Sequence, residues 1–435
     1  MSSSMTMKTA VVMTAVAVLG IAGCATSPSK APTAADPTTR NPGQGSPPVM
    51  ADSQTPSSSA SPSPASQIGT PASATAPSSP SPSLGRHLYV APSGSESNPG
   101  TKEMPVKTIA KASTLARPGT TVHVAAGTYP GDFVTNAAGS ATARIRYISD
   151  TPWGARIVPP SVPTGRTIAW DNRGRYVDIV GFTVDGTSAA DTKWANGIVT
   201  RAAYSRIMNN HVHHIANSSA YCDRMGGSGV NASNDSRDGT RAEHIDLLAN
   251  VVHHIGPAGY CNKTHGVYMS VSGTLKNNVV YGIAGWGIHL WHDARNVDIV
   301  NNTVVRSQGG GILVAGGDAT LPGGADYCRV MNNIVYGNRQ GISEQGMYGT
   351  HNTYVNNLSQ GAWMSGYDYS LGNPHSRDIT GKPRFMDDAG GDYRLGTGSP
   401  GLDVGLSDLA PEEDVEGRPR PQGRAFDLGA YERPV

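Results

Sequence analysis

The sequence predicts an all-β protein in which short strands stack coil upon coil into a parallel β-helix, a form of solenoid. Three observations point to this fold. Glycine is abundant, at 53 residues, whereas phenylalanine occurs only 4 times, a composition typical of turns and short strands. Two short motifs alternate along the middle of the chain. One column of positions within them is aliphatic in every copy, as a stripe that faces a continuous core must be.

The first motif places two asparagines between hydrophobic residues, as in IMNNHVHHI and LKNNVVYGI. Asparagine adopts left-handed backbone angles readily, and stacked asparagine side chains can hydrogen bond along a ladder. A propeller or a β-sandwich is the alternative, but the repeat is short for a propeller blade and hairpin signals are lacking. We therefore expect one such turn per coil, with the second asparagine at Asn210, Asn250, Asn278, Asn302, Asn333 and Asn357.

The second motif is a glycine followed by an apolar residue, and it sets which side chains face outward. The residues directly after the glycine point into the core: Ile198, Val230, Val267, Ile288, Ile312 and Ile342. Since side chains alternate along a strand, the next residue of each copy faces outward: Val199, Asn231, Tyr268, His289, Leu313 and Ser343. A second outward column follows two residues later: Arg201, Ser233, Ser270, Trp291, Ala315 and Gln345. The inward position between these columns is uncharged except for Glu344 in the last copy.

Residues 86–435 resemble the right-handed parallel β-helix proteins of the pectate-lyase-like superfamily. The resemblance rests on the repeat, on the opening HLYVAPSGSESNPGTKEMPVKTIAKASTLARPGTTVHVAAGTY and on the closing GDYRLGTGSPGLDVG. It implies a right-handed solenoid with an N-terminal capping helix at PVKTIAKASTLA, in which Pro105 stands at the start. The apolar residues that this helix should bury are Val106, Ile109 and Leu115. Both ends are specific for the fold, and neither is specific for an activity.

Residues 1–23 have the pattern of a secretory signal. Lys8 precedes an apolar run over residues 10–19 that is too short to span a membrane as a stable helix. The sequence Ile-Ala-Gly-Cys that ends at Cys24 resembles the lipobox of bacterial lipoproteins, which implies cleavage before Cys24 and lipidation of its thiol. An ordinary signal peptide is the alternative.

Residues 24–85 are rich in Pro, Ser, Ala and Thr and carry too little apolar surface to fold. The predicted organisation is thus a signal peptide (1–23), a lipidated cysteine with a disordered tether (24–85) and a β-helix domain (86–435). We expect a monomer outside the cytoplasm, anchored by lipid to a bacterial outer membrane or cell surface. The net charge of +1 gives no electrostatic reason to expect nucleic acid as a partner.

The cysteines also bear on the arrangement of the coils. Cys222 and Cys261 occupy matching places in successive coils, a short loop after Ile215 and Ile255. Because matching places stack, we predict a disulfide bond between them, with Cys328 left free.

The outward columns predict a binding surface for a polysaccharide. Adjacent strands lie about 4.8 Å apart, so Tyr268 and His289 should be neighbours on one open face, under loops at 233–244 and 256–265. Aromatic rings can stack on sugars while polar groups bind their hydroxyls. The candidate substrate-binding residues are Asn231, which lies beyond Tyr268, together with Trp286, Trp291, His292 and Asp293.

A lyase that cleaves a uronic-acid polymer by β-elimination is the activity we favour for this surface. It needs a base to remove the proton α to the carboxyl group, and a cation or donor to neutralise the carboxylate. Tyr268 or Lys263 can be the base. His289, Lys263, Arg241 or a bound Ca²⁺ can neutralise the charge, and His265 lies nearby in sequence. Lyases of the superfamily that this chain resembles use Lys, Arg, Tyr or His in this way, often with Ca²⁺.

Other interpretations of the same face stay open. A glycoside hydrolase needs two carboxylates about 5–10 Å apart, which would have to come from Asp235, Asp238, Asp293 or Glu344 because the outward columns contain none. A lipoprotein that only binds polysaccharide, or that takes part in exopolysaccharide export, needs no catalytic group. The alternative without any function is a solvated strand face that packs under the loop at 256–265. Convergence of the catalytic candidates favours an enzyme.

Two sequence features bear on metal binding. The loop NDSRDG offers oxygen ligands from Asp235 and Asp238 that suit Ca²⁺, although turn-forming polar loops look the same. The doublets His213-His214 and His253-His254 fall on consecutive coils, and we expect a stacked ladder there rather than a zinc site.

Overall fold

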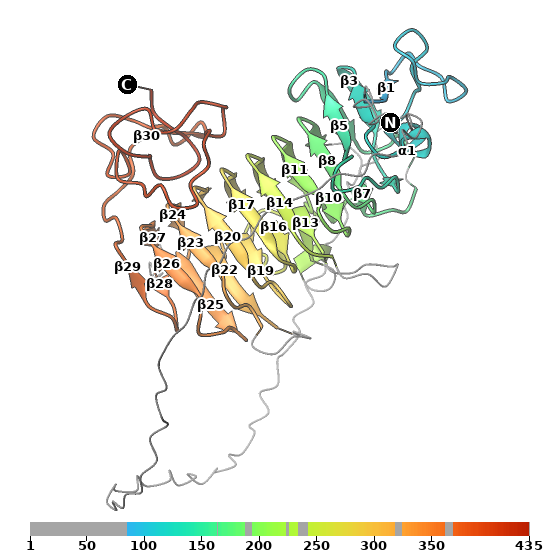
Figure 1. The fold of residues 1–435 in the computed structure, drawn as a ribbon. Helices are drawn as coiled ribbons and strands as arrows, with labels where there is room; N and C mark the ends of the chain where they lie inside the picture. The colour runs from blue at the N-terminus through green and yellow to red at the C-terminus, as the bar shows by residue number, and fades with distance from the viewer. Residues whose placement is uncertain are drawn as a thin grey trace, which may run out of the picture. The chain divides into compact units, whose positions relative to one another are not determined.

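The chain winds around three parallel sheets, and each coil contributes one strand to each sheet in turn (Figure 1). The computed structural model describes residues 85–162, 164–187, 194–222, 226–233, 242–317, 324–361 and 369–434. Strands pair in parallel with their counterparts one coil away. The predicted parallel β-helix is therefore confirmed.

Several predicted features lie outside the described residues: the signal peptide, Cys24, the tether up to residue 84, and Asp235, Asp238 and Arg241. In the described parts of the chain, none of the helices has both the length and the apolar character that crossing a membrane requires.

The three sheets are named I, II and III here. Sheet I consists of β1 (His87–Val90), β2 (Thr121–Val124), β5 (Ile145–Ser149), β8 (Val177–Val180), β11 (Arg206–Met208), β14 (Ile245–Leu248), β17 (Gly273–Lys276), β20 (Val297–Val300), β23 (Arg329–Met331), β26 (Thr353–Val355) and β29 (His375–Ser376). Sheet II consists of β4 (Phe133–Thr135), β7 (Ile168–Asn172), β10 (Asn196–Thr200), β13 (Gly227–Ala232), β16 (Thr264–Met269), β19 (Trp286–Leu290), β22 (Gly310–Gly316), β25 (Ile342–Gly346) and β28 (Tyr369–Ser370). Sheet III consists of β3 (Gly127–Pro130), β6 (Ala155–Val158), β9 (Thr183–Asp185), β12 (His211–Ile215), β15 (Val251–Ile255), β18 (Val279–Ile283), β21 (Thr303–Val305), β24 (Ile334–Asn338) and β27 (Leu358–Gly361).

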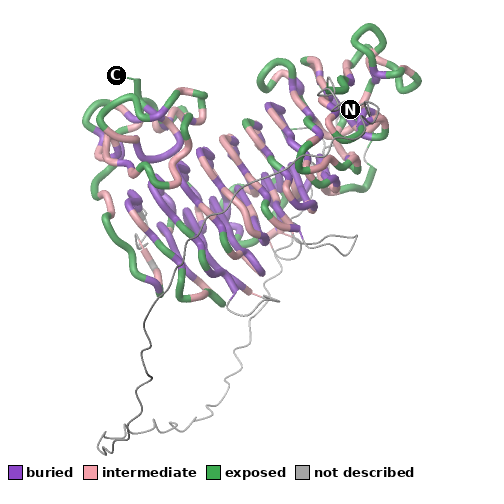
Figure 2. Tube along the Cα trace, in the orientation of Figure 1, coloured by how far each residue is buried: buried purple, intermediate pink, exposed green. Residues whose placement is uncertain are grey.

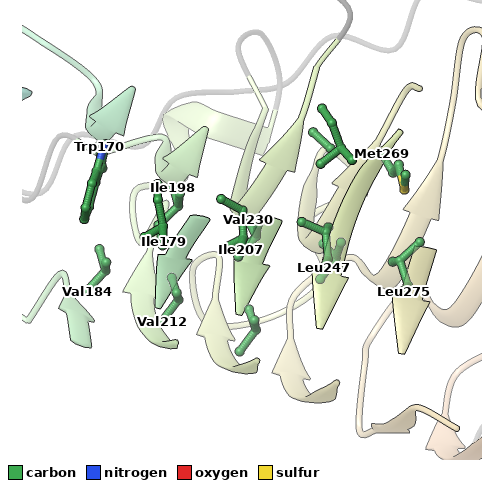
Figure 3. Close-up of a cluster of buried hydrophobic side chains, with 14 of the residues drawn as sticks. Trp170, Ile179, Val184, Ile198, Ile207, Val212, Val230, Leu247, Met269 and Leu275 are labelled. Atoms are coloured by element: carbon green, nitrogen blue, oxygen red, sulfur yellow. The ribbon is translucent and has the colours of Figure 1, made fainter. Parts of the chain in front are cut away.

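The core runs along the inside of the solenoid, between the three sheets. Figure 3 shows buried side chains of several coils gathered there, among them Ile179, Ile198, Ile207 and Val230. The aliphatic column predicted to face inward is buried in every copy, and Figure 2 shows buried residues along the stacked strands. The register read from the second motif is therefore confirmed.

The repeated glycine of the second motif lies where the facing wall of the coil leaves no room for a side chain. A Cβ at Gly229 would lie 2.4 Å from Val252 Cγ1, and a Cβ at Gly266 would lie 2.4 Å from Val280 Cγ1. Both distances are far below van der Waals contact, so no other residue fits. This close approach holds sheet II against sheet III.

The asparagine ladder forms as predicted, and the two asparagines of each copy have different roles. The second is buried: Asn250 Nδ2 donates to Asn278 Oδ1 at 3.0 Å, and Asn278 Nδ2 donates to Asn302 Oδ1 at 2.9 Å. The first has the left-handed backbone, with φ of 56° at Asn277 and 54° at Asn301. The turn at each corner is thus specified by one residue and the interior ladder by the next.

The predicted capping helix is α1 (Ile109–Leu115). It begins after Thr108, whose hydroxyl oxygen accepts a hydrogen bond from Lys111 N at 3.1 Å. The expected start at Pro105 was wrong by several residues because Thr108 is the N-cap. Val106 and Ile109 are buried as predicted, whereas Leu115 is only partly covered.

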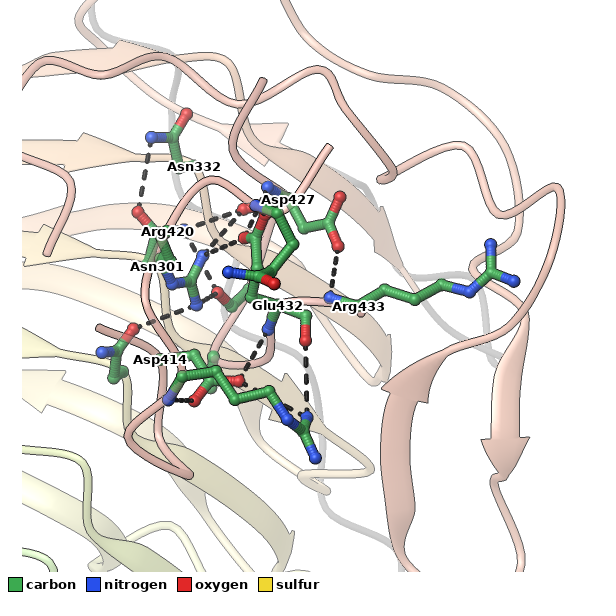
Figure 4. A network of polar contacts seen from close by, with 12 residues as sticks. Asn301, Asn332, Asp414, Arg420, Asp427, Glu432 and Arg433 are labelled. Carbon is green, nitrogen blue, oxygen red and sulfur yellow. Dashed lines mark hydrogen bonds and ion pairs between the residues drawn. The ribbon is translucent and has the colours of Figure 1, made fainter. Parts of the chain in front are cut away.

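After the last coil comes an antiparallel hairpin of β30 (Phe385–Asp387) and β31 (Asp392–Leu395). An irregular C-terminal segment, residues 396–434, follows the hairpin. This segment binds the corner asparagines of four coils, through hydrogen bonds from Asn277, Asn301, Asn332 and Asn356 to its backbone carbonyls. Arg420 and Glu432 form a buried ion pair at 3.3 Å within it, and Arg420 also donates to the Asp427 carbonyl (Figure 4).

Candidate active site

A pocket of about 450 Å³ opens on the outer face of sheet II. Seven of the candidate catalytic and substrate-binding residues line it: Asn231, Lys263, His265, Tyr268, Trp286, His289 and Trp291. The other lining residues are Asn196, Gly226, Gly227, Ser228, Asn262, Leu313 and Gln345. The predicted site residues therefore converge rather than scatter along the solenoid.

Strand register brings the central residues together. Asn231 of β13 pairs with Tyr268 of β16, which pairs with His289 of β19. The Tyr268 and His289 rings are 5.3 Å apart, centre to centre, in an edge-to-face arrangement. The sequence prediction that these two side chains are neighbours, with Asn231 beyond Tyr268, is confirmed.

His265 and His289 form a hydrogen-bonded pair at the centre of the pocket. His265 Nε2 and His289 Nδ1 are 3.0 Å apart, and the ring centres are 4.0 Å apart. His265 was expected in an overhanging loop, but it lies on strand β16, which begins at Thr264. The strand extends back past Gly266 because Thr264 and His265 pair with Gly227 and Ser228 of β13.

Both imidazoles are neutral at neutral pH. Burial lowers the pKa of His265 to about 3. Burial also lowers the pKa of His289 well below 6.5, and the neighbouring His265 and His292 lower it further. His289 was expected on an open face, yet only 9% of it is exposed, since the rings of His265, Tyr268 and Trp291 surround it.

Two buried polar atoms of the pocket, Asn231 Oδ1 and His265 Nδ1, have no hydrogen-bond partner among the residues that the structure describes. An unpaired buried polar group costs about 1–3 kcal/mol. Asn231 is held by its amide nitrogen, which donates to Asn196 Oδ1 at 3.4 Å, and Ser228 Oγ donates to the same oxygen at 2.7 Å. Asn196, Ser228 and Asn231 make this end of the pocket polar, which suits the hydroxyl groups of a ligand.

The opposite end of the pocket is aromatic and apolar. Trp286 is 4% exposed and packs with Leu313 and Ala315, and Trp291 covers this cluster. Both indoles lie across glycines of the next coil: a Cβ at Gly310 would touch Trp286, and one at Gly317 would touch Trp291. Glycine at these places makes room for flat rings against the sheet, a surface on which a sugar ring can stack.

Lys263 supplies a cation at the rim. Its backbone carbonyl accepts a hydrogen bond from Gly227 N at 2.9 Å, and its side chain lines the pocket. The predicted disulfide between Cys222 and Cys261 is present, and Cys328 is a free, buried thiol, as predicted. The disulfide ties the loop that carries Lys263 to the preceding coil and so fixes the rim.

The other candidate residues that the structure describes do not line the pocket. The His292 ring is 6.3 Å from that of Tyr268, centre to centre, but His292 does not line the cavity. Asp293 is buried and lines a separate hollow with Arg295 and Tyr327. Glu344 points inward, as its column requires, and accepts hydrogen bonds from Asn352, Tyr354 and Asn373. Of the four carboxylates considered for a hydrolase, Asp293 and Glu344 thus lie outside the pocket, and Asp235 and Asp238 lie outside the described residues.

Sequence reasoning missed Asn196 and Ser228. They stand directly before the glycine of the second motif, where simple alternation predicts nothing reliable. The glycine and the residue after it both lie against the interior, so the residue before the glycine is turned outward. The column Asn196, Ser228, His265 and Trp286 lines the pocket for this reason. The repeat of glycine itself was the signal that could have located it.

Comparison with known proteins gives two short sequence matches. Residues 92–133 match the family described as "Protein of unknown function (DUF1565)". A segment of 45 residues is 56% identical to an uncharacterized protein of Bacillus subtilis (strain 168), YwoF, and the match spans 10% of this chain and 10% of that protein.

Solved structures resemble the solenoid as a whole. Pectate lyase Pel9A aligns with a TM-score of 0.52 at 17% identity, over 80% of this chain and 96% of that protein. An alginate lyase from Paenibacillus sp. str. FPU-7 aligns with a TM-score of 0.39 at 14% identity, over 66% of this chain and 99% of that protein. At this identity the likeness to pectate lyase Pel9A shows a shared fold, and the chain is a parallel β-solenoid resembling pectate lyase.

Proposed function

We propose that this chain is a polysaccharide lyase that acts outside the cytoplasm and cleaves a uronic-acid-containing polymer by β-elimination. One observation carries the proposal: a single pocket combines an aromatic platform, a neutral histidine pair and a lysine. None of its described lining residues is Asp or Glu. This set of groups suits proton abstraction beside a carboxylate better than acid-base hydrolysis by two carboxylates.

Substrate binding follows from the two ends of the pocket. A sugar ring stacks on Trp291, which packs against the buried Trp286, while its hydroxyls pair with Asn231 and the neighbouring Ser228. The Lys263 ammonium pairs with the uronate carboxylate and offsets the charge that builds there as the α-proton leaves. Because His289 is neutral, it does not serve as that cation, a role the sequence left open to it.

We assign proton abstraction to His289. In the tautomer that this requires, His289 Nδ1–H donates to His265 Nε2, and His289 Nε2 carries the lone pair. His265 then bears its proton on Nδ1, a buried atom to which no described residue is hydrogen-bonded.

The reaction then balances. The α C–H bond breaks and its proton goes to His289, a carbon–carbon double bond forms between the α and β carbons, and the β C–O bond breaks. The Tyr268 hydroxyl protonates the leaving oxygen, and the proton held by His289 restores Tyr268.

Ca²⁺ has no part in these steps. Related lyases often use it, but the described lining of this pocket offers no carboxylate, and Ca²⁺ prefers several such oxygens. Asp235 and Asp238 lie outside the described residues. The steps above therefore depend only on side chains of the pocket.

The proposed location rests on two features. A disulfide persists in oxidising compartments, and Cys222–Cys261 is such a bond. The lipobox-like sequence before Cys24 supports lipid anchoring to a bacterial membrane. Palmitate labelling of the wild type and of Cys24→Ala tests the anchor separately from activity, and equal labelling of both contradicts it.

The test of activity is incubation of the chain with a panel of uronate polymers, including pectate and alginate. Ultraviolet absorbance of the unsaturated product should rise together with reducing ends. A rise in reducing ends alone indicates hydrolysis and overturns the lyase. Retention of a polymer on the immobilised protein with neither change indicates a binding protein, as exopolysaccharide export would require.

A further inference from the structure

A second cluster of chemically active side chains lies on sheet III, away from the pocket. It contains Asp185 of β9, three histidines of β12 and two of β15: His211, His213, His214, His253 and His254. Asp185 pairs with His213, and His213 pairs with His253, in the registers of neighbouring strands. Three successive coils therefore bring Asp185, His213 and His253 to one column, with the other histidines beside it.

The doublets expected to stack do so. The His213 and His253 rings are 5.0 Å apart at an angle of 7°, and the His214 and His254 rings are 5.1 Å apart at 4°. The predicted ladder is thus confirmed, but it is not the whole arrangement. His214 and His254 have φ of 57° and 52°, so the backbone turns each of them back toward the preceding histidine.

This turn makes nitrogen atoms converge. His213 Nδ1 and His214 Nδ1 are 2.7 Å apart, and His213 Nδ1 is 3.5 Å from Asp185 Oδ1. One donor atom from each of the three residues lies within 4.8 Å of the other two. Ligand atoms bound to zinc at about 2.0–2.1 Å in tetrahedral geometry lie about 3.3 Å apart. The distance of 2.7 Å between the two histidine nitrogens is shorter than this separation, and the distance of 3.5 Å from His213 Nδ1 to Asp185 Oδ1 is slightly longer.

We propose that Asp185, His213 and His214 form a binding site for one divalent transition-metal ion, and Zn²⁺ is the ion with which the proposal is tested. Imidazole nitrogens favour zinc, copper or nickel over Ca²⁺ or Mg²⁺. Two histidines and one carboxylate leave a fourth position for water, the pattern of zinc sites that stay open. His213 and His214 are only partly buried, so an ion can enter from solvent.

The surroundings hold the ligands in place. Asp185 Oδ1 accepts hydrogen bonds from Thr187 N at 2.8 Å and from the Thr187 hydroxyl at 2.5 Å. The Arg156 guanidinium pairs with Asp185 Oδ2 from β6, and its side chain is half exposed, so it can move as a cation binds. Such outer partners orient metal ligands. Stacking on His253 and His254 fixes the planes of the two imidazoles.

The site is independent of the proposed lyase reaction. Its residues belong to sheet III, whereas the pocket lies on sheet II. β12 and β15 lead directly into the loops that carry Cys222 and Cys261. An ion bound by β9 and β12 joins adjacent coils, so it should also raise the temperature of unfolding by mass action.

The experiment is calorimetric titration of the full chain with Zn²⁺, using protein that carries no histidine tag. We expect one ion per chain and a higher unfolding temperature. Asp185→Asn keeps the shape of the side chain. His214→Asn suits the left-handed backbone, which asparagine tolerates. Each substitution should weaken Zn²⁺ binding by at least about 10-fold, the smallest loss expected even from removing an outer-shell partner.

His351→Ala is the matched control, because His351 pairs with Asp326 outside the cluster and its loss should leave Zn²⁺ binding unchanged. Circular dichroism verifies that each variant folds. Zn²⁺ binding that stays at wild-type strength in both Asp185→Asn and His214→Asn overturns the proposal. So does a wild-type chain that takes up no Zn²⁺, Ni²⁺ or Cu²⁺, in which case the short nitrogen contacts are hydrogen bonds alone.

Discussion

At the scale of single residues, His265 and His289 give the pocket its chemical character. Each is buried, and burial holds the pKa of each below that of free histidine. A neutral imidazole presents a ring nitrogen with a free lone pair, whereas the exposed Lys263 at the rim supplies charge. The neutral base, His289, is thus buried in the pocket, whereas the cation, Lys263, lies exposed at its rim.

Removing the base should abolish turnover without unfolding the protein. We expect His289→Ala to lower kcat on the active polymer by roughly 10²–10⁴-fold, the usual contribution of a general base. Tyr268→Phe should lower it by a similar factor, because the phenyl ring keeps the packing but has no proton to donate. Steady-state rates and thermal melting measure both effects.

His87→Ala is the control for that series, since His87 is an exposed residue of β1 far along the chain from the pocket. Wild-type rates in both His289→Ala and Tyr268→Phe would remove these two residues from the reaction.

The folded protein should lose stability as the pH falls below 6.5. The pKa of His265 is about 3 in the folded state and about 6.5 in an unfolded chain. The unfolded chain binds more protons between these values, so the contribution of His265 is complete above pH 6.5 and declines toward pH 3. Its titratable neighbours are His289, His292, Tyr268 and Lys263. Urea unfolding at a series of pH values measures the slope, which His265→Gln should flatten; an unchanged slope contradicts this assignment.

The centre of the site was predictable from sequence because alternation along a strand has a fixed period. Tyr268 and His289 follow from that period alone. His265 was placed in a loop, and Asn196 and Ser228 were missed, because the glycine beside them breaks the alternation. That break arises from contact with sheet III, a tertiary effect that a strand pattern does not contain.

At the scale of elements, the asparagine ladder links each corner to the next. Each buried amide both donates to the following rung and caps a backbone carbonyl, as Asn278 does with Leu247 O at 2.8 Å. The pattern predicted a ladder but not which asparagine would be inside. The backbone decides this, because only the first position has the left-handed φ, and Ala249 occupies it in one coil with φ of 53°.

Breaking one rung should cost more than one hydrogen bond. Asn278→Ala removes the acceptor of Asn250 N and Nδ2 and leaves Leu247 O and Asn302 Oδ1 without this donor. At about 1–3 kcal/mol for each buried group left unpaired, we expect the free energy of unfolding to fall by at least ~2 kcal/mol. Denaturant titration measures it. Asn209→Gly, at an exposed corner with φ of 55°, is the matched change that should leave stability nearly unchanged.

At the scale of the whole molecule, the solenoid was predictable because every coil repeats the same constraint. A repeat specifies its neighbours, and the fold follows from adding coils. The C-terminal segment was not predictable in this way, since its contacts with Asn277 and Asn301 join positions more than 120 residues apart without any period.

The C-terminal segment should detach when its buried ion pair is broken. Arg420→Ala leaves Glu432 buried without its partner, a change that typically destabilises by about 3–5 kcal/mol. We expect limited proteolysis to cut within residues 396–434 before any strand of sheets I to III, and mass spectrometry of the first fragments identifies the site. A first cut within the coils would show that the segment does not depend on this pair.

The C-terminal segment is hydrogen-bonded to the corner asparagines of four coils, and this attachment limits how the number of coils can change in evolution. Each coil adds about 4.8 Å along the axis, and the segment reaches its four asparagines with a fixed length of chain. A duplicated or deleted coil in this stretch would put the anchoring points out of step with their carbonyls. The C-terminal segment thus fixes the number of coils between its anchoring asparagines, and we expect coils to be gained or lost only where the segment does not span them.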